Sequence, residues 1–432
     1  MKQEIKERVE KIRKGEVPDG YKETKVGIIP DDWNILELNK HTTKISDGIH
    51  TTPKYVEKSE YFFINGNNLK NGKVVITANT KCVSGDEFKK HKRELNSNTI
   101  LMSINGTIGE CAFYNHEKVI LGKSAAYVNC INKEDVLFIY YNLQSSRSIN
   151  HYYSELTGST IKNLSLKSLK DTPIPSPYPK ERQKIAEILS TWDKAIELKE
   201  KLIEEKKEFK RGLIQKLLVG KIRFKEYVKN PNLQEVRRYS TLPEDWSIKK
   251  ASSIFSNIST KNNDNEKLLS ATQDNGVIPR DMLDGDVMSP SGDTNSYKLV
   301  EEGDFVISLR TFQGGIEYSC YRGIISPAYT VIKNKIPICA DFYRYIFKSK
   351  LFIDRLASSV IGIRDGKQIS YGDFSFMFLP YPELKEQEKI AFSLKNLDDN
   401  IELLELELNH LKEQKRGLMQ LLLTGIVRVE VD

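Results

Sequence analysis

One long segment of this sequence occurs twice. Lys180–Arg223 and Lys385–Arg428 align without a gap at a constant offset of 205 residues, and 22 of the 44 aligned positions are identical. This repeat constrains the architecture more than any other feature, because each copy must fold into the same unit. Each copy predicts one long helix, and each helix ends one half of the chain.

The second copy carries a heptad seam of apolar residues. Their spacings alternate between four and three positions, which is typical of a coiled coil rather than of a core helix. The first copy keeps part of this seam but has three lysines where it should continue. The second seam consists of Ile390, Leu394, Leu397, Ile401, Leu404, Leu408, Leu411, Leu418 and Leu422, interrupted by Lys415; the first consists of Ile185, Leu189, Trp192, Ile196, Ile203, Leu213 and Leu217, with Lys199, Lys206 and Lys210 as the interruptions.

Duplicated units tend to associate about a pseudo-twofold axis, which would make the two helices antiparallel. At 1.5 Å per residue, about 40 residues span roughly 60 Å. We therefore expect the helices to pair as an antiparallel coiled coil that holds two globular units at a fixed separation. The alternative is a pair of unrelated amphipathic helices, each packed on its own domain.

Gly212 and Gly417 occupy the same place in each Arg-Gly-Leu triplet. Glycine inside a helix costs about 1 kcal/mol relative to alanine. Either the helix bends at these glycines or another helix packs closely against them. The residues expected to take part in helix or partner packing are Trp192, Ile196, Gly212, Leu213, Leu397, Ile401, Gly417 and Leu418.

The repeat extends beyond the helices, since Pro30–Trp33 (PDDW) has its counterpart in Pro243–Trp246 (PEDW). Between each motif and its long helix, apolar runs of strand length alternate with polar turns, as in Asn98–Ile104 and Asp304–Leu309. We therefore predict an α+β fold with two globular mixed α/β domains, each followed by a long helix. The expected segments are a helical extension at 1–20, a first domain at 21–179, a first helix at 180–220, a linker at 221–238, a second domain at 239–384, a second helix at 385–425 and a tail at 426–432.

Composition narrows the class of protein. Hydrophobic residues make up 39% of the 432 residues and the mean hydropathy is −0.47, which is ordinary for a soluble protein. No segment approaches the ~20 apolar residues of a membrane span. The five cysteines are scattered and never spaced as Cys-x-x-Cys, so we expect reduced thiols and a cytoplasmic location. The net charge of +7 favours an acidic partner only weakly.

No catalytic motif stands out in the sequence. Gly122–Ser124 (GKS) lacks the upstream glycine of a phosphate-binding loop, which is Glu117 here. The six histidines fall in no metal-ligand spacing. Pro18-Asp19 followed by Glu23–Lys25 formally resembles a nuclease signature, but the spacing is too short for two strands. We therefore expect a binding protein that is not an enzyme and holds neither a metal ion nor a cofactor.

Two loops, one in each half, have matching scaffold positions but different polar side chains. Asn105–Gly109 follows the repeated strand in the first half, and Arg310–Gly314 follows it in the second. Asn and Gln can pair with adenine and Arg with guanine in the major groove, so the loops would prefer different bases, while nearby basic residues contact phosphates. For any one of these residues, the alternative is solvated surface. The candidate DNA-binding residues are Lys89, Lys92, Arg93, Asn105, Thr107, Arg310, Thr311, Gln313, Arg364, Lys367 and Gln368.

Several of these segments together resemble the DNA-specificity subunit of type I restriction-modification systems. The segments that carry the resemblance are Ile28–Trp33 (IIPDDW) and Thr241–Trp246 (TLPEDW), the helix entries KERQKIA at Lys180 and KEQEKIA at Lys385, and the KRGL-x-Q-x-LL-x-G endings of both helices. The resemblance covers nearly the whole chain, and the paired occurrence at a constant offset makes it specific.

The resemblance implies two target recognition domains, each reading one half of a split, asymmetric site on double-stranded DNA. It also implies that the antiparallel helices set the spacer between the half-sites and dock two methyltransferase subunits. S-adenosylmethionine, ATP and magnesium are then expected on methyltransferase and restriction (translocase) subunits, which methylate adenine N6 and cleave DNA, and none on this chain. The alternatives are a coiled-coil scaffold that binds only protein, and a stand-alone nuclease or methyltransferase.

Overall fold

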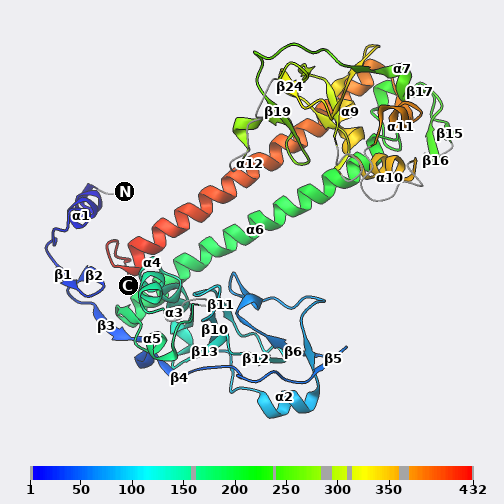
Figure 1. Ribbon diagram of the computed structural model, residues 1–432. Coiled ribbons are helices and arrows are strands. Elements are labelled where there is room, and N and C mark those ends of the chain that lie inside the picture. Colours follow the sequence, from blue (N-terminus) through cyan, green and yellow to red (C-terminus); the bar gives the residue numbers. More distant parts are fainter. Residues whose placement is uncertain are drawn as a thin grey trace. The chain divides into compact units, whose positions relative to one another are not determined.

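The computed structural model describes residues 3–156, 162–236, 240–283, 294–308, 314–359 and 369–430 (Figure 1). The chain forms two units, one made of Met1–Glu200 with Glu407–Asp432 and the other of Lys201–Leu406. The two long helices, α6 (Pro179–Leu217) and α12 (Leu384–Leu423), both contribute to each unit. The predicted α+β fold with two mixed domains and two long helices is confirmed. No helix among the described residues is both long and apolar enough to cross a membrane.

Short strands and helices make up the rest of each unit. In the first unit they are α1 (Gln3–Arg13), β1 (Tyr21–Thr24), β2 (Gly27–Pro30), β3 (Asn34–Glu37), β4 (Thr42–Asp47), β5 (Tyr55–Val56), β6 (Tyr61–Ile64), β7 (Leu69–Lys70), β8 (Lys73–Val74), β9 (Cys82–Val83), α2 (Gly85–His91), β10 (Thr99–Ser103), β11 (Cys111–Phe113), β12 (Val119–Leu121), β13 (Ala125–Cys130), α3 (Val136–Leu143), α4 (Ser146–Ser154), α5 (Leu166–Lys170) and β14 (Pro173–Ser176). In the second unit they are β15 (Leu233–Val236), β16 (Ser240–Pro243), β17 (Ser247–Lys250), α7 (Ala251–Ile254), β18 (Phe255–Ile258), β19 (Leu269–Thr272), β20 (Gly276–Pro279), β21 (Lys298–Val300), β22 (Phe305–Ile307), β23 (Glu317–Tyr318), β24 (Gly323–Ile325), β25 (Thr330–Asn334), α9 (Ala340–Lys348), α10 (Lys350–Ser359), α11 (Tyr371–Ser375) and β26 (Phe378–Tyr381).

A four-stranded antiparallel sheet lies at the centre of each unit. Its order is β11-β10-β13-β4 in the first unit and β23-β22-β25-β18 in the second, so the sequence repeat extends through the sheet. A separate antiparallel pair, β14 with β3 and β26 with β17, joins the strand before each long helix to the start of its domain. Each long helix therefore begins from a strand that is fixed within its own domain.

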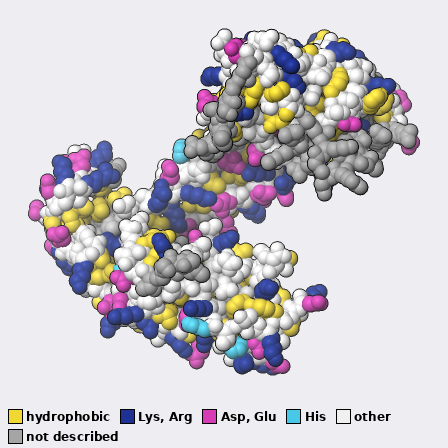
Figure 2. Space-filling model, viewed as in Figure 1, with side chains coloured by type: hydrophobic (Ala, Val, Ile, Leu, Met, Phe, Trp, Pro, Cys, Tyr) yellow, Lys and Arg dark blue, Asp and Glu magenta, His cyan; other side chains and the backbone are white. Residues whose placement is uncertain are grey.

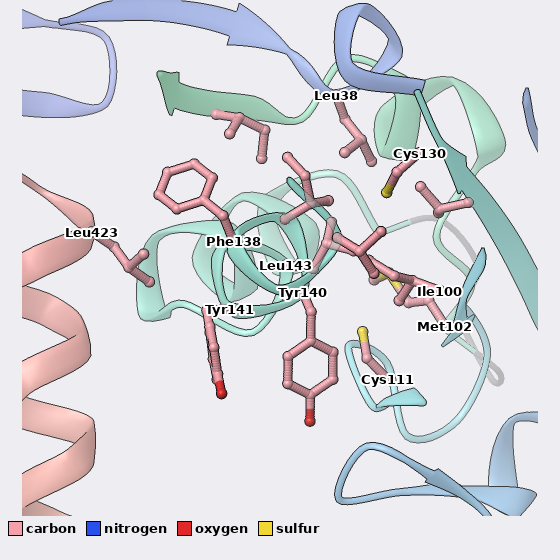
Figure 3. Packing of buried hydrophobic residues seen from close by; sticks show 14 of the residues in the cluster. Leu38, Ile100, Met102, Cys111, Cys130, Phe138, Tyr140, Tyr141, Leu143 and Leu423 are labelled. Atoms are coloured by element: carbon pink, nitrogen blue, oxygen red, sulfur yellow. The ribbon is translucent and has the colours of Figure 1, made fainter. Parts of the chain in front are cut away.

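The strand β10 is buried along its whole length, because both faces of its sheet are covered. Ile100 and Met102 pack into a core with α3, while Leu101 packs on the other face with β6 and β12. A strand covered on both sides has a continuous apolar run rather than an alternating one. Figure 3 shows that Leu423 of α12 belongs to the same core as α3, so the C-terminal helix helps to close the N-terminal domain.

Within each unit, the two long helices are antiparallel and carry an equivalent ion pair. In the first unit, Lys415 Nζ lies 2.5 Å from Asp193 Oδ1, and the Tyr141 hydroxyl donates to Asp193 Oδ2 at 2.6 Å. In the second unit, Lys210 pairs with Asp398 in the same way. Lysines that interrupt the apolar seam are thus paired with carboxylates of the facing helix, which explains why the seam tolerates them.

The predicted place of Lys206 in the seam was wrong. Its side chain is exposed, whereas Lys207 is half-buried and pairs with Glu405 at 2.6 Å. Regular alternation of spacings places the seam at Lys206, three residues after Ile203 and four before Lys210, whereas in the structure it is the neighbouring Lys207 that faces Glu405 of α12. Six of the residues predicted to take part in helix packing are at least half-buried. Ile401 is buried, and the half-buried ones are Trp192, Ile196, Leu213, Leu397 and Leu418.

Gly212 and Gly417 lie on open helix surface. A Cβ atom added at either would meet no described atom within 4 Å outside the helix backbone. Replacing either glycine by alanine should therefore raise the free energy of unfolding by up to about 1 kcal/mol, measured by chemical denaturation. The matched control is Gly220→Ala, which should destabilise, since Gly220 has φ +65° and its Cβ would lie 2.4 Å from Cγ of Pro243. A lower free energy of unfolding for all three alanine variants would contradict the finding that Gly212 and Gly417 lie on open helix surface.

An arginine just beyond the end of α6 clamps the start of the second domain. Arg223 donates to the two carboxylate oxygens of Glu386 at 2.8 and 2.9 Å and to Asp245 at 2.7 Å. Its guanidinium lies over the Trp246 ring, 5.7 Å from the centroid, and the indole N–H of that tryptophan donates to Glu386 at 2.9 Å. The repeated Pro-acidic-acidic-Trp motif is therefore a structural one, because it fixes the domain to both long helices.

The C-terminal segment makes the same clamp in the first unit. Arg428 donates to Glu181 at 2.7 and 2.8 Å and to both carboxylate oxygens of Asp32 at 2.9 Å, and the indole N–H of Trp33 donates to Glu181 at 3.2 Å. The Tyr21 hydroxyl also donates to the carbonyl of Gly425 at 2.8 Å. Residues from the last part of the chain thus complete the domain that its first part begins.

Candidate nucleic-acid interface

Four loops of the first unit meet at one end of its central sheet. The backbone N–H of Ile49 donates to the carbonyl of Leu121 at 2.8 Å, and the N–H of Ile104 donates to the carbonyl of Ser124 at 3.0 Å. The polar side chains of four separate loops therefore share one surface, called the loop surface below. The loops are 47–52 after β4, 65–68 after β6, 104–110 after β10 and 122–124 before β13.

Glycine is needed where these loops approach one another. A Cβ atom at Gly48, Gly66 or Gly122 would lie only 2.0 to 2.2 Å from an atom of a neighbouring strand end or loop. Ser124 strengthens the contact, because its hydroxyl accepts from the N–H of Gly66 at 2.9 Å and donates to Oδ1 of Asn65 at 3.0 Å. This close packing fixes the backbone from which the exposed side chains project.

The loop surface presents polar and basic side chains to solvent. The side chain of His50 is 59% exposed and bonds Asp47 through Nε2 at 2.8 Å. Asn67, Thr107 and Lys123 are exposed as well, and Lys123 bonds no other described residue. Amide, hydroxyl and imidazole groups can contact base edges, while an unpaired ammonium group can contact a phosphate. The set has the chemistry expected of a groove-reading surface.

Three basic residues predicted from the sequence lie beside the loop surface. Arg93 Nη2 donates to the carbonyl of Gly48 at 3.0 Å, which holds this arginine against the loop after β4. Lys89 on α2 and Lys92 just after it are exposed, and neither bonds another described residue. α2 packs through Phe88 on β9 and β12. In Figure 2, Lys and Arg side chains are spread over the visible face of each unit rather than gathered in one patch.

The two predicted residues of the loop after β10 differ in their access to solvent. Thr107 is exposed, and its Oγ1 lies 3.3 Å from the Ser103 hydroxyl. Asn105 is half-buried, and its Oδ1 is buried without a hydrogen-bond partner among the described residues. A buried acceptor left without a partner costs about 1–3 kcal/mol. Contact of the Asn105 amide with adenine would therefore need this side chain to turn outward.

Sequence reasoning missed three members of the loop surface, His50, Asn67 and Lys123. The available signal was the set of glycines at strand ends, one of which precedes Lys123, but the short sequence Gly122–Ser124 by itself resembles only an incomplete phosphate-binding loop. Their proximity arises from pairing between strands far apart in the sequence. In the part of the chain that the structure describes, no group of three or more His, Cys, Asp or Glu side chains could hold a metal ion.

We expect Lys123→Ala to weaken DNA binding about equally across sequences and to lower the slope of log affinity against log salt by about 1, because one phosphate contact is lost. Fluorescence anisotropy over a salt series measures both quantities. Lys40→Ala is the matched control: Lys40 is exposed, but it precedes β4, whereas the loop surface follows that strand. If the two substitutions weakened DNA binding equally, the loop surface would not be part of the DNA interface.

The corresponding candidates of the second unit, Arg310, Thr311, Gln313, Arg364, Lys367 and Gln368, lie outside the described residues. The chain that follows the first group is anchored. Lys348 Nζ donates to the carbonyls of Gly314 at 2.9 Å and Gln273 at 3.0 Å, and it lies 2.6 Å from Oε2 of the buried Glu317. One ammonium group thus joins three segments next to this loop.

Burial raises the pKa of Glu317 to about 7, although the Lys348 ammonium acts in the opposite direction. Because this pKa exceeds the ordinary value near 4.5, the folded state binds more protons than the unfolded state between these two pH values. Protonation of Glu317 therefore contributes at most about 3 kcal/mol to the free energy of unfolding. This contribution is fully present below about pH 4.5 and is lost as the pH rises through 7.

Glu317→Gln tests this pH dependence, because the amide stays neutral. The melting temperature of the variant minus that of the wild type should increase by several degrees between pH 5 and pH 8, at roughly 2–4 °C per kcal/mol. Differential scanning calorimetry of both proteins over this range measures it. A difference that moves in favour of the wild type as the pH rises would mean that the ion pair lowers the pKa of Glu317 instead.

Two units with one scaffold and a pair of antiparallel long helices give the chain a repeated, modular architecture. Residues 30–207 and 243–413 match the family model of the type I restriction modification DNA specificity domain. Since these two stretches cover most of the chain, the chain belongs to this family.

Relatives match along almost the whole length. A Methanocaldococcus jannaschii protein, named as the MjaX type I restriction enzyme specificity subunit, is 26% identical over 438 residues, which cover 95% of this chain and 97% of the relative. The MjaVIII specificity subunit of the same organism is 25% identical over 435 residues, with the same coverage.

Two solved structures are similar in fold. The S subunit of a type I restriction-modification system from M. genitalium has a TM-score of 0.51 at 18% identity, covering 93% of this chain and 97% of that one. A chain from a structure of type I R-M complex assembly and conformational transition has a TM-score of 0.54 at 13% identity, covering 92% and 99%. At these identities the likeness concerns the fold.

Proposed function

We propose that this chain is the DNA-recognition subunit of a type I restriction-modification complex, in which each domain reads one half of a bipartite, asymmetric target. The observation that carries the proposal is the combination of equal scaffolds with unequal loops. The central sheets and arginine clamps are repeated, whereas Asn105–Gly109 and Arg310–Gly314 differ in their polar side chains. Equivalent scaffolds present both loops to DNA in the same manner, and different side chains select different bases.

In this proposal, the paired helices set the spacer between the two half-sites. Each helix is continuous, over Pro179–Leu217 and Leu384–Leu423, and starts from a strand held in its own domain. The length of the helices then determines how many base pairs separate the two half-sites, because both domains must contact the same duplex at once.

The helices also offer surface for docking the methyltransferase subunits. Several large apolar side chains along them are exposed, which is costly unless a partner covers them. Leu198 and Leu403, which are 66% and 55% exposed, occupy equivalent positions of the two copies, as do the open glycines Gly212 and Gly417. Equivalent positions suit two copies of one partner. The exposed apolar residues are Leu198, Leu202 and Phe209 on α6 and Phe392, Leu403 and Leu406 on α12.

Catalysis in this proposal belongs to the partners. The methyltransferase subunits supply S-adenosylmethionine and methylate adenine N6, and the restriction subunits supply ATP-driven translocation with magnesium. The role of this chain is to position those activities on one sequence, and it binds no cofactor itself.

Mapping of methylated adenines tests the proposal. The chain is expressed with its cognate methyltransferase subunits in a host that lacks adenine methylation, and modified positions are read by single-molecule sequencing. We expect one split motif with a fixed spacer, and loss of the motif when this chain is omitted. Methylation that persists without the chain, or stable partner binding with no sequence preference on DNA, would favour a protein-binding scaffold instead.

A further inference from the structure

The first unit contains a groove that lies outside the loop surface and the arginine clamp. Its volume is about 890 Å³, and it lies between the turn that joins β1 to β2, the helix α4 and the last turns of α12. Ile12 of α1 closes one side. All of these segments belong to the first unit, so the groove is formed within one folded unit.

The floor of the groove is apolar. Ile149 of α4 contributes to it, as do Met419 and Leu423 of α12 and Ile426 beyond that helix. Ile12 belongs to the helix α1, in which Ile12 is half-buried and no described residue is fully buried. An exposed apolar groove of this kind generally marks a site where another chain binds.

The polar lining carries positive charge and no carboxylate. Lys25, Arg147 and Arg416 line the groove, and no Asp or Glu is among its described lining residues. None of the three cations pairs with a described residue. Arg147 is the most informative, because its guanidinium is half-buried and burial lowers its pKa to about 10. A cation held out of water without a counter-charge is unfavourable, so an incoming carboxylate would relieve a cost already present in the free chain.

The second unit differs at the equivalent place. Ser145 and Ser349 accept equivalent capping hydrogen bonds at the starts of α4 and α10, so Arg147 corresponds to Leu351, which lines a cavity of only about 10 Å³. Arg211 corresponds to Arg416 and pairs with Glu204 and Glu208, at 3.3 and 3.7 Å. The cationic groove therefore has no equivalent among the described residues of the second unit.

We propose that this groove is a docking site for an acidic amphipathic helix of a partner protein, one copy per chain. The apolar side of such a helix covers Ile149, Met419 and Leu423, and its flanking carboxylates pair with Arg147 and Arg416. Helices commonly bind in grooves through apolar residues at helical spacing, and complementary charge sets their orientation. Duplex DNA fits the cations less well, because its sugar-phosphate backbone offers nothing to cover the apolar floor.

The test uses the full-length chain and a fluorescein-labelled helical peptide with leucines on one face and glutamates on both flanks. Its affinity is measured by anisotropy for the wild type and for the double variant Arg147→Leu/Arg416→Gln, in which position 147 takes the residue type of the second repeat. We expect the double variant to bind the peptide at least about tenfold more weakly. Arg211→Gln, the matched control on α6, should leave the affinity unchanged.

Three results would overturn the inference: no binding of the peptide to the wild type, equal affinity of the double variant, or equal binding of a peptide with lysines in place of the glutamates. Displacement of the peptide by duplex DNA, with weaker DNA binding by the double variant, would assign the groove to nucleic acid. Binding of all variants to the mapped DNA target is measured in parallel, because unchanged DNA binding by the double variant shows that it is folded and that the groove takes no part in DNA recognition.

Discussion

Replacing Arg223 by alanine should lower the free energy of unfolding by about 3–5 kcal/mol, since it removes one partner of a buried ion pair. The side chains of Arg223 and Glu386 are 7% and 2% exposed, so little water reaches the carboxylate that remains. After the substitution, Glu386 keeps only the indole N–H of Trp246 among the hydrogen bonds of the clamp. Chemical denaturation followed by circular dichroism measures the loss.

In the first unit, the equivalent substitution Arg428→Ala should lower the free energy of unfolding by about half as much. Arg428 is 37% exposed, and water screens its interaction with Glu181 and Asp32. Arg416→Ala is the control for loss of an arginine as such: it is exposed, bonds no other described residue, and should change stability by no more than about 0.5 kcal/mol. If Arg223→Ala were as mild as this control, the clamp would not stabilise the domain.

Shortening both long helices by one heptad should change the target that the complex prefers. Deletion of Glu200–Lys206 together with Glu402–Leu408 shortens the helix pair by about 10 Å. That is close to three base pairs at roughly 3.4 Å each. Binding to the original target should weaken at least about a hundredfold, because one domain loses its half-site, and a target with a shorter spacer should bind instead.

The deletion is chosen to preserve the packing of the helices. It keeps the heptad phase and retains the ion pairs of Asp193 with Lys415 and of Lys210 with Asp398. A matched control, Lys207→Ala with Glu405→Ala, removes a half-buried ion pair without changing helix length and should leave spacer preference unchanged. Binding of a spacer library, sequenced before and after selection, reads the preference directly. An unaltered optimum in the deletion protein would show that the helices do not set the spacer.

The elements that repeat could be predicted from the sequence because they obey local rules. The heptad spacing fixed which helix faces pair, and the constant offset related the strand containing Ile100 to the strand containing Phe305. The heptad pattern pointed to Lys206, whereas the structure pairs the neighbouring Lys207 with Glu405 of the facing helix. The role of Trp33 could not be inferred either, since its partners Glu181 and Arg428 come from distant parts of the chain.

The candidate site was predicted only in part. Arg93 and Thr107 lie at the loop surface, whereas His50, Asn67 and Lys123 reach it through strand pairing that no short motif encodes. The buried Oδ1 of Asn105 shows that a polar residue in an exposed loop can still be turned inward. Residue type predicted the chemistry of the surface, and three-dimensional packing decided which atoms are accessible.

The return of the C-terminal segment to the N-terminal domain sets an order for folding during synthesis. All residues of the second unit lie in one continuous stretch, and the ribosome has produced them once Leu406 is added. The first unit starts earlier but needs Leu423 for its core and Arg428 for its clamp. Domains usually fold in the order of their synthesis. Here the domain that is translated first becomes complete last. A chain truncated after Leu406 would therefore keep all residues of the second unit but lack residues that the first unit needs.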